Sequence, residues 1–126
     1  MDTPLMAMLP ASDYERAKAW YRDKLGLTPV RDEPEGADYE IGGVRFGVYP
    51  SQFAGTNQAT AAGFYVDDIE KTIDELTAKG VVFEQYDMPG LKTDEKGIAE
   101  LGPFKGAWFK DSEGNILVVS EEAPPS

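Results

Sequence analysis

One pattern occurs twice in this chain, and the repeat restricts the fold more than any other feature. Each copy contains a helix-capping residue, apolar residues at helical spacing and a glycine that ends the helix. Ser12 and Gly26 bound the first predicted helix, and Asp67 and Gly80 bound the second. The two predicted N-caps lie about 55 residues apart, so the two halves have the same length and the same order of elements.

Short segments with the alternation or β-branched content of strands surround each predicted helix. One such segment precedes each helix and three follow it, so each half reads as a β-α-β-β-β module. The fold class is therefore α+β. The predicted strands are residues 5–11, 28–32, 37–41 and 44–50 in the first half, and residues 61–66, 81–87, 105–110 and 115–120 in the second.

Neither module can bury its sheet alone, because one helix covers only one face. We expect the two curved mixed sheets to close around a central cavity, within one domain that spans residues 1–126. Module one covers about residues 3–50, a linker covers 51–60 and module two covers about 61–121. Residues 88–104 form a long stretch without a strand pattern and are a candidate lid. The tail, residues 122–126, is predicted to be disordered.

Composition excludes several kinds of chemistry. The 126 residues include no cysteine and no histidine, so neither a thiolate nor an imidazole is present as a nucleophile, base or metal ligand. The 23 acidic and 12 basic residues give a net charge of −11. That charge disfavours nucleic acid and anionic membranes as partners and favours a cationic ligand. An alternative is that the acidic residues only keep the surface soluble.

The chain has no candidate targeting or membrane segment. No apolar run approaches the roughly 20 residues that a membrane-spanning helix needs. The N-terminal sequence MDTPLMAML lacks the basic start and long apolar stretch of a signal peptide. We therefore expect a cytoplasmic protein.

Strand alternation assigns each strand residue to a face of its sheet. The pair Gly42-Gly43 predicts a two-residue hairpin turn, which places Glu40 opposite Arg45. By this parity Val44, Phe46 and Val48 pack under a helix. The residues expected to face the cavity are Met6, Met8, Pro10, Asp38, Glu40, Arg45, Gly47, Tyr49, Ala61, Gly63, Tyr65, Trp108, Ile116, Val118 and Ser120.

Three segments together resemble a known family. They are LPASDYERAKAWYRDKLGL (9–27), FYVDDIEKTIDELTAKGVVF (64–83) and WFKDSEGNILVV (108–119). The chain resembles the vicinal oxygen chelate superfamily, which includes glyoxalase I, extradiol dioxygenases, fosfomycin-resistance transferases and bleomycin-resistance proteins. The third segment is similar to the family's Asp-Pro-x-Gly-Asn turn, with Ser112 in place of proline. The resemblance implies the fold described above and leaves the chemistry open.

The resemblance also implies where metal-dependent members hold their ligands. Those positions correspond to Met6, Gly47, Ala61 and Val118 in this sequence. None of the four side chains suits a hard divalent cation. We therefore expect no metal, no cofactor, and neither glyoxalase nor dioxygenase activity by the usual metal-dependent route.

The leading hypothesis is a metal-free protein that binds and sequesters a small aromatic or cationic molecule, similar to the bleomycin-resistance branch. It is expected to form a homodimer, because pairing of modules across two chains is common in the family. Arg45 either clamps an anionic group of the ligand or pairs with Glu40 across the hairpin. The predicted ligand-binding residues are Met6, Met8, Asp38, Glu40, Arg45, Tyr49, Tyr65, Trp108 and Val118.

Two alternatives remain open. In the first, the protein is a metal-independent lyase or isomerase of the same superfamily. Asp38, Glu40 or a tyrosine would then transfer a proton, and Arg45 would stabilise an enolate-like charge. In the second, the protein is a dimeric interaction module without a small ligand. That reading requires a closed cavity and an exposed apolar patch.

Overall fold

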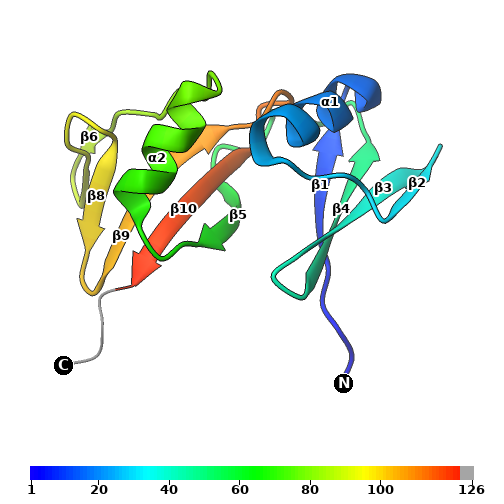
Figure 1. Ribbon diagram of the computed structural model, residues 1–126, viewed down its shortest axis with the longest axis horizontal. Helices are drawn as coiled ribbons and strands as arrows, with labels where there is room; N and C mark the ends of the chain where they lie inside the picture. The colour runs from blue at the N-terminus through cyan, green and yellow to red at the C-terminus, as the bar shows by residue number, and fades with distance from the viewer. Residues whose placement is uncertain (123–126) are drawn as a thin grey trace. The chain divides into compact units, whose positions relative to one another are not determined.

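The computed structural model describes residues 1–122, which form two compact units. The first unit contains residues 1–58 together with 111–115, and the second contains residues 59–110 and the strand that begins at residue 116. Each unit has one major helix and one four-stranded mixed sheet (Figure 1). The predicted repeat of β-α-β-β-β and the α+β class are thus confirmed, whereas closure of the two sheets around a shared cavity stays a prediction.

In the first unit, the strand order across the sheet is β1-β4-β3-β2. Strand β1 runs parallel to β4, and the other neighbours are antiparallel. A helix follows β1, as the sequence predicts. The elements are β1 (Ala7–Ala11), α1 (Tyr14–Leu25), β2 (Arg31–Glu33), β3 (Gly36–Ile41) and β4 (Val44–Pro50).

The second unit has the same topology, with the order β5-β10-β9-β8. Strand β5 runs parallel to β10, and β10, β9 and β8 are antiparallel to their neighbours. A separate two-stranded hairpin precedes β8. The elements are β5 (Thr60–Tyr65), α2 (Ile69–Ala78), β6 (Asp87–Met88), β7 (Leu91–Lys92), β8 (Ile98–Leu101), β9 (Phe104–Lys110) and β10 (Ile116–Glu122).

The core of each unit lies on the face of the sheet that its helix covers. In the first unit the ring of Tyr21 from α1 packs against Tyr39 and Phe46 from the sheet, with ring centroids 5.7 and 5.8 Å away. In the second unit Ile69 and Ile73 of α2 are buried. In both sheets alternate strand residues are buried as well. They are Leu9, Ala11 and Val48 in the first sheet, and Ala107, Phe109, Leu117 and Val119 in the second.

The predicted helix starts are each displaced by one residue. The N-cap of α1 is Asp13, whose carboxylate accepts a hydrogen bond from the backbone N–H of Arg16, and not Ser12. The N-cap of α2 is Asp68, not Asp67. Aspartate, serine and a second aspartate are all good caps, so local preference alone does not select among them. The predicted glycine stops are correct: Gly26 is the left-handed C-cap of α1, and α2 ends before Gly80.

Two predictions about the second module are wrong. Residues 81–87 form no long strand, and their contribution to the sheet is an isolated bridge between Phe83 and Phe109. The fourth strand of the sheet is β8 instead, so the candidate lid at 88–104 contains β7, β8 and the start of β9. Strand β8 pairs with Phe104–Ala107 of β9 in four register positions, and residues 81–87 pair with β9 through the isolated bridge at Phe109.

Smaller corrections concern the ends of strands. Val44 is 61% exposed at the hairpin end of β4, so it does not pack under the helix. Strand β5 begins at Thr60, inside the predicted linker. Glu122 belongs to β10 and not to a disordered tail, and residues 123–126 of that predicted tail lie outside the described residues. Met6 precedes β1, so strand parity does not place it.

Candidate functional site

The first open face is the side of the first sheet that faces away from α1. Its defining residues are Met8 on β1, Gly47 on β4 and Asp38 on β3. Gly47 pairs with Met8 on one side and with Asp38 on the other. A Cβ atom built on Gly47 would lie 2.8 Å from Met8 Sδ and 3.5 Å from Asp38 Oδ1. The thioether of Met8 and the carboxylate of Asp38 therefore both lie close to the backbone of Gly47, on the same face of the sheet, as strand alternation predicts.

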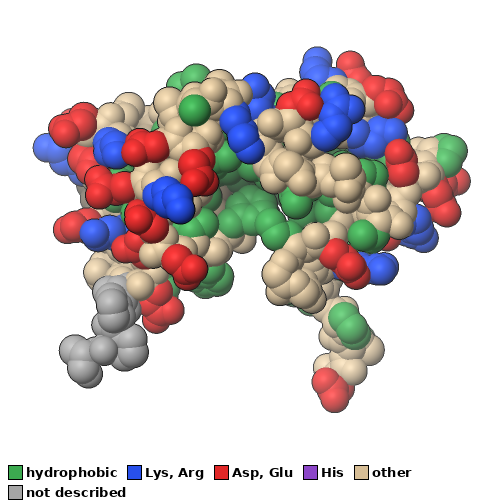
Figure 2. Space-filling view, viewed as in Figure 1, with side chains coloured by type: hydrophobic (Ala, Val, Ile, Leu, Met, Phe, Trp, Pro, Cys, Tyr) green, Lys and Arg blue, Asp and Glu red, His purple; other side chains and the backbone are tan. Residues whose placement is uncertain are grey.

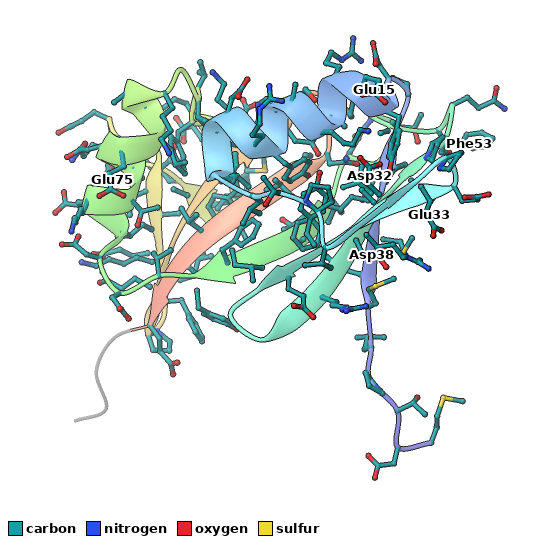
Figure 3. The ribbon with its side chains drawn as sticks, turned by 45° about the vertical axis from the view of Figure 1, so that its right-hand side comes forward. Glu15, Asp32, Glu33, Asp38, Phe53 and Glu75 are labelled. Atoms are coloured by element: carbon teal, nitrogen blue, oxygen red, sulfur yellow. The ribbon has the colours of Figure 1, made fainter. Side chains whose placement is uncertain are left out.

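Asp38 is the most buried charged residue on this face. Its side chain is 9% exposed, and Oδ2 lies 3.0 Å from Nε of Arg31, the residue opposite it on β2. The side chain of Arg31 is 59% exposed and also approaches Glu33, at 3.9 Å. In Figure 3, Asp38 lies apart from Asp32, whose carboxylate accepts hydrogen bonds from Lys18 and Tyr14 of α1. The side chains of the two aspartates thus lie on opposite faces of the first sheet.

Arg45 and Glu40 form the second ion pair of the first open face. Nε of Arg45 donates to Oε1 of Glu40 at 2.9 Å, and both side chains are about half exposed. This hydrogen bond and the charge of Glu40 raise the pKa of the Arg45 guanidinium. Of the two roles considered for Arg45, the pairing with Glu40 is present in the structure. Tyr49, two residues after Gly47 on β4, is half-buried on the same face.

The second open face is the side of the second sheet that faces away from α2, and Trp108 of β9 is its main feature. Nε1 of the indole donates to Oγ1 of Thr60 at 3.1 Å. The ring of Tyr86 meets the indole edge-on, with centroids 5.8 Å apart. The far edge of the indole lies against Gly106, where an added Cβ would be 3.2 Å from Cη2. The indole is therefore held on several sides.

Glycines also shape the rest of the second open face. Val118 of β10 lies between Gly63 of β5 and Trp108 in the register of the sheet. A Cβ on Gly63 would lie 2.8 Å from Cγ1 of Val118, so this valine folds over the glycine. Tyr65, two residues further along β5, is 81% exposed. Aromatic and aliphatic side chains of this face thus cover the backbone at two glycines, Gly63 and Gly106.

A buried polar cluster in the first unit was not predicted from the sequence. It is formed by the 111–115 turn, whose contacts place it with the first unit although its flanking strands belong to the second. Oδ2 of Asp111 accepts from the hydroxyl of Tyr21 at 2.6 Å and from Nδ2 of Asn115 at 2.8 Å. Oδ1 accepts from two backbone N–H groups of the turn. Burial and the nearby charge of Asp111 raise the pKa of Tyr21.

Glu113, in the same turn, is fully enclosed by donors. Its side chain is 1% exposed and accepts from Nε of Arg16 at 2.8 Å, from the backbone N–H of Asp13 at 2.8 Å and from Ser112 Oγ at 2.7 Å. Burial alone would raise the pKa of Glu113, but these hydrogen bonds and the charge of Arg16 lower it to about 2. Glu113 thus accepts from Ser12, Asp13 and Arg16 at the start of α1, so the turn anchors this end of the helix.

The residues present do not fit the metal centre that the family resemblance implies. Met6 and Gly47 offer no oxygen or nitrogen side-chain ligand in the first unit, and Ala61 and Val118 offer none in the second. Met8 Sδ already occupies the space that a side chain on Gly47 would enter. Within residues 1–122, no group of three or more His, Cys, Asp or Glu side chains is arranged to hold a metal ion. Thioether and hydrocarbon groups are poor ligands for Mg²⁺, Mn²⁺ or Zn²⁺.

The comparisons with known proteins identify the family. The sequence profile of the Glyoxalase/Bleomycin resistance protein/Dioxygenase superfamily matches residues 4–119. The chain belongs to this superfamily. The comparison with curated protein sequences gave no match. Within the described residues, no helix is long and apolar enough to cross a membrane.

Solved structures with the same fold cover nearly the whole chain. A glyoxalase family protein from Enterococcus faecalis is 24% identical, with a TM-score of 0.70, and the match covers 96% of this chain and 98% of that one. A lactoylglutathione lyase from Agrobacterium tumefaciens is 19% identical, with a TM-score of 0.71 and coverage of 96% and 94%. The fosfomycin resistance protein FosX from Listeria monocytogenes, solved with Mn(II) and sulfate, is 10% identical, with a TM-score of 0.69 and coverage of 99% and 92%.

Proposed function

We propose that this member of the superfamily binds a small, planar, positively charged molecule without a metal ion, and sequesters it instead of transforming it. Three observations support the proposal. The positions of the family's metal ligands carry Met6, Gly47, Ala61 and Val118, none of which suits a hard cation. The second open face offers a fixed indole. The first open face carries a buried carboxylate, and the chain has a net charge of −11.

The geometry of Trp108 is the observation that carries the proposal. An indole held by Thr60, Tyr86 and Gly106 loses little conformational freedom when a planar ligand stacks on it. Aromatic faces also attract cations, and tryptophan does so most strongly. Tyr65, which is largely exposed on the same sheet face, offers a second ring, and Val118 offers aliphatic surface between them.

Surface charge supports the choice of a cationic ligand. In the view of Figure 2, acidic side chains are spread over much of the surface, and basic side chains lie among them and are densest over helix α1. Acidic residues outnumber basic ones by 23 to 12. The long-range field of such a chain raises the encounter rate of a cation and lowers that of an anion.

The test is a binding titration with matched planar compounds that differ in charge. Protein thermal stability and tryptophan fluorescence are followed against a cationic, a neutral and an anionic aromatic compound of the same ring size. We expect saturable stabilisation by the cation and quenching of the indole emission. Trp108→Ala should weaken binding of the cation at least about tenfold, since stacking on an indole contributes on the order of 1–3 kcal/mol.

Trp20→Phe is the matched control, because Trp20 lies on helix α1 and not on either open face. It should leave the affinity unchanged while removing part of the fluorescence. Stabilisation by Ni²⁺, Zn²⁺, Mn²⁺ or Fe²⁺ at one equivalent would contradict the metal-free proposal. A flat response to every aromatic compound would contradict ligand binding itself.

We also propose that the protein is cytoplasmic. We propose further that it forms a homodimer, since pairing of modules across two chains is common in the superfamily. Light scattering on the purified chain measures the mass in solution. A mass of one chain at micromolar concentration would contradict the dimer and leave the ligand-binding proposal to its own test.

A further inference from the structure

We propose that Asp38 is a binding site for an amidinium or guanidinium group, and that Arg31 occupies this site until a ligand displaces it. The inference rests on the proposed function and deepens it, because it names the charged group of the ligand and the residue that competes with it. It concerns only the first open face, where Asp38, Arg31, Gly47 and Met8 lie together.

Asp38 has the properties of an acceptor for a bidentate cation. A carboxylate with a side chain 9% exposed requires a charged partner, and Arg31 supplies one, with Nε 3.0 Å from Oδ2. An amidinium presents two parallel N–H groups and can engage both oxygens of a carboxylate, which is the strong arrangement for such a pair. An amidinium is therefore a suitable competitor for the place of Arg31.

The space beside Oδ1 is set by the absence of a side chain at Gly47. Oδ1 lies 3.5 Å from the position where a Cβ of Gly47 would be, and Met8 Sδ fills the same space from the other side. Met8 is 48% exposed, and its unbranched side chain has three rotatable bonds. A flat cationic group can therefore reach Oδ1 if the methionine side chain swings toward solvent, and no backbone atom has to move.

Arg31 is placed to leave Asp38 easily. It lies on β2, an edge strand of three exposed residues, and its side chain is 59% exposed. Glu33, on the same strand, lies 3.9 Å from Nη1 of Arg31 and can pair with the guanidinium after displacement. Ion pairs with an exposed partner contribute little net free energy, so the exchange is not costly.

Arg22 provides the contrast that makes the inference testable. It carries the same charge but lies on helix α1, where its Nε donates to Asp23 at 2.9 Å. Both side chains are exposed, so this pair does not occupy a buried acceptor. Removing Arg22 thus changes the net charge as much as removing Arg31 does, without changing the partner of Asp38.

The experiment measures binding of benzamidine, with neutral benzamide as the isosteric control, by calorimetry at low and high salt. Arg31→Gln should tighten benzamidine binding about fivefold, because the competing internal cation is gone. Arg22→Gln should change it less than about twofold, through long-range charge alone. Asp38→Asn, checked for folding by circular dichroism, should weaken benzamidine binding at least about tenfold. Benzamide should bind all four proteins equally weakly.

An independent readout uses the wild-type protein. The Nε–H resonance of Arg31 should shift and exchange faster with water when benzamidine is added, and should not respond to benzamide. Equal tightening by Arg31→Gln and Arg22→Gln would overturn the inference in favour of a general charge effect. Unchanged binding by folded Asp38→Asn would also overturn it. In that case, a loss caused by Trp108→Ala would keep the proposed function, whereas no binding of any aromatic cation to any variant would overturn both.

Discussion

Helices α1 and α2 begin alike but are held at their starts in different ways. Each has an aspartate N-cap, and each start also donates a backbone N–H to a glutamate from a later part of the chain. The carboxylate of Glu113 accepts a hydrogen bond from the backbone N–H of Asp13 at 2.8 Å, and that of Glu121 accepts one from the N–H of Ile69 at 3.0 Å. Glu113 is enclosed and also bound by Arg16. Glu121 is half-buried, and within residues 1–122 its side chain accepts this one hydrogen bond.

This difference shows that two units with the same topology can hold their helices by different kinds of interaction. The first helix depends on a network of buried charge and hydroxyl groups from the 111–115 turn. The second depends on apolar packing, since Ile69, Ile73 and Leu76 are 1–8% exposed on its inner side. Polar networks are sensitive to pH and to loss of a single partner, whereas apolar packing responds mainly to volume. The two units should therefore respond differently to the same kind of substitution.

The largest expected effect follows Asp111→Ala. This change leaves the hydroxyl of Tyr21 and the amide of Asn115 without their buried acceptor, and should lower the free energy of unfolding by about 3–4 kcal/mol. Urea unfolding measures the loss, and hydrogen exchange should show faster exchange in α1 than in α2. Tyr21→Phe, which removes one hydroxyl, should cost about 1 kcal/mol. Equal protection of both helices in the Asp111 variant would contradict the contrast between the units.

A smaller effect is expected for Glu113→Gln, and it should depend on pH. Because the folded protein lowers the pKa of Glu113 from 4.5 to about 2, its stabilisation is present above pH 4.5 and is lost as the pH falls toward 2. At neutral pH the variant should be less stable than the wild type by about 2 kcal/mol, and the difference should shrink below pH 4. Thermal unfolding from pH 7 to pH 2 measures both. A difference that stays constant with pH would show that Glu113 does not act through its charge.

The smallest effect is expected for Glu121→Gln. Glutamine can still accept the N–H of Ile69 through its carbonyl oxygen, so the change should cost less than about 0.5 kcal/mol at neutral pH. The same unfolding experiments serve as the measurement. A cost as large as that of Glu113→Gln would remove the distinction between the two helix starts.

Local pattern was sufficient for the order of elements because helix stripes, turn glycines and strand alternation act over a few residues. The hairpin at Gly42-Gly43 illustrates this, since both glycines have positive φ and the register Glu40–Arg45 follows from the turn. The same parity correctly placed Asp38 opposite Gly47, and Trp108 opposite Val118.

Contacts between separate segments of the chain explain which positions the sequence pattern predicted wrongly. Ser12 fits an N-cap by type, but its hydroxyl donates to Glu113, 101 positions away, and Asp13 takes the capping role. Arg31 was missed as a neighbour of Asp38 because β2 is three exposed residues without alternation. The apolar run at residues 81–87 resembles a strand, yet β8 pairs with most of the free edge of β9. In each case the partner lies on another strand or turn, so the pattern within one segment does not identify it.

The position of the 111–115 turn has a consequence for how such a chain can be divided. The repeat suggests two halves that one cut near the linker would separate, yet the first unit takes five residues from the second half of the sequence. A fragment that ended at residue 58 would lack the acceptor for Tyr21 and the counter-charge for Arg16. The segment that the sequence repeats and the unit that folds are therefore not the same piece of chain. The first unit can be completed only after the second half, with the 111–115 turn, has been translated.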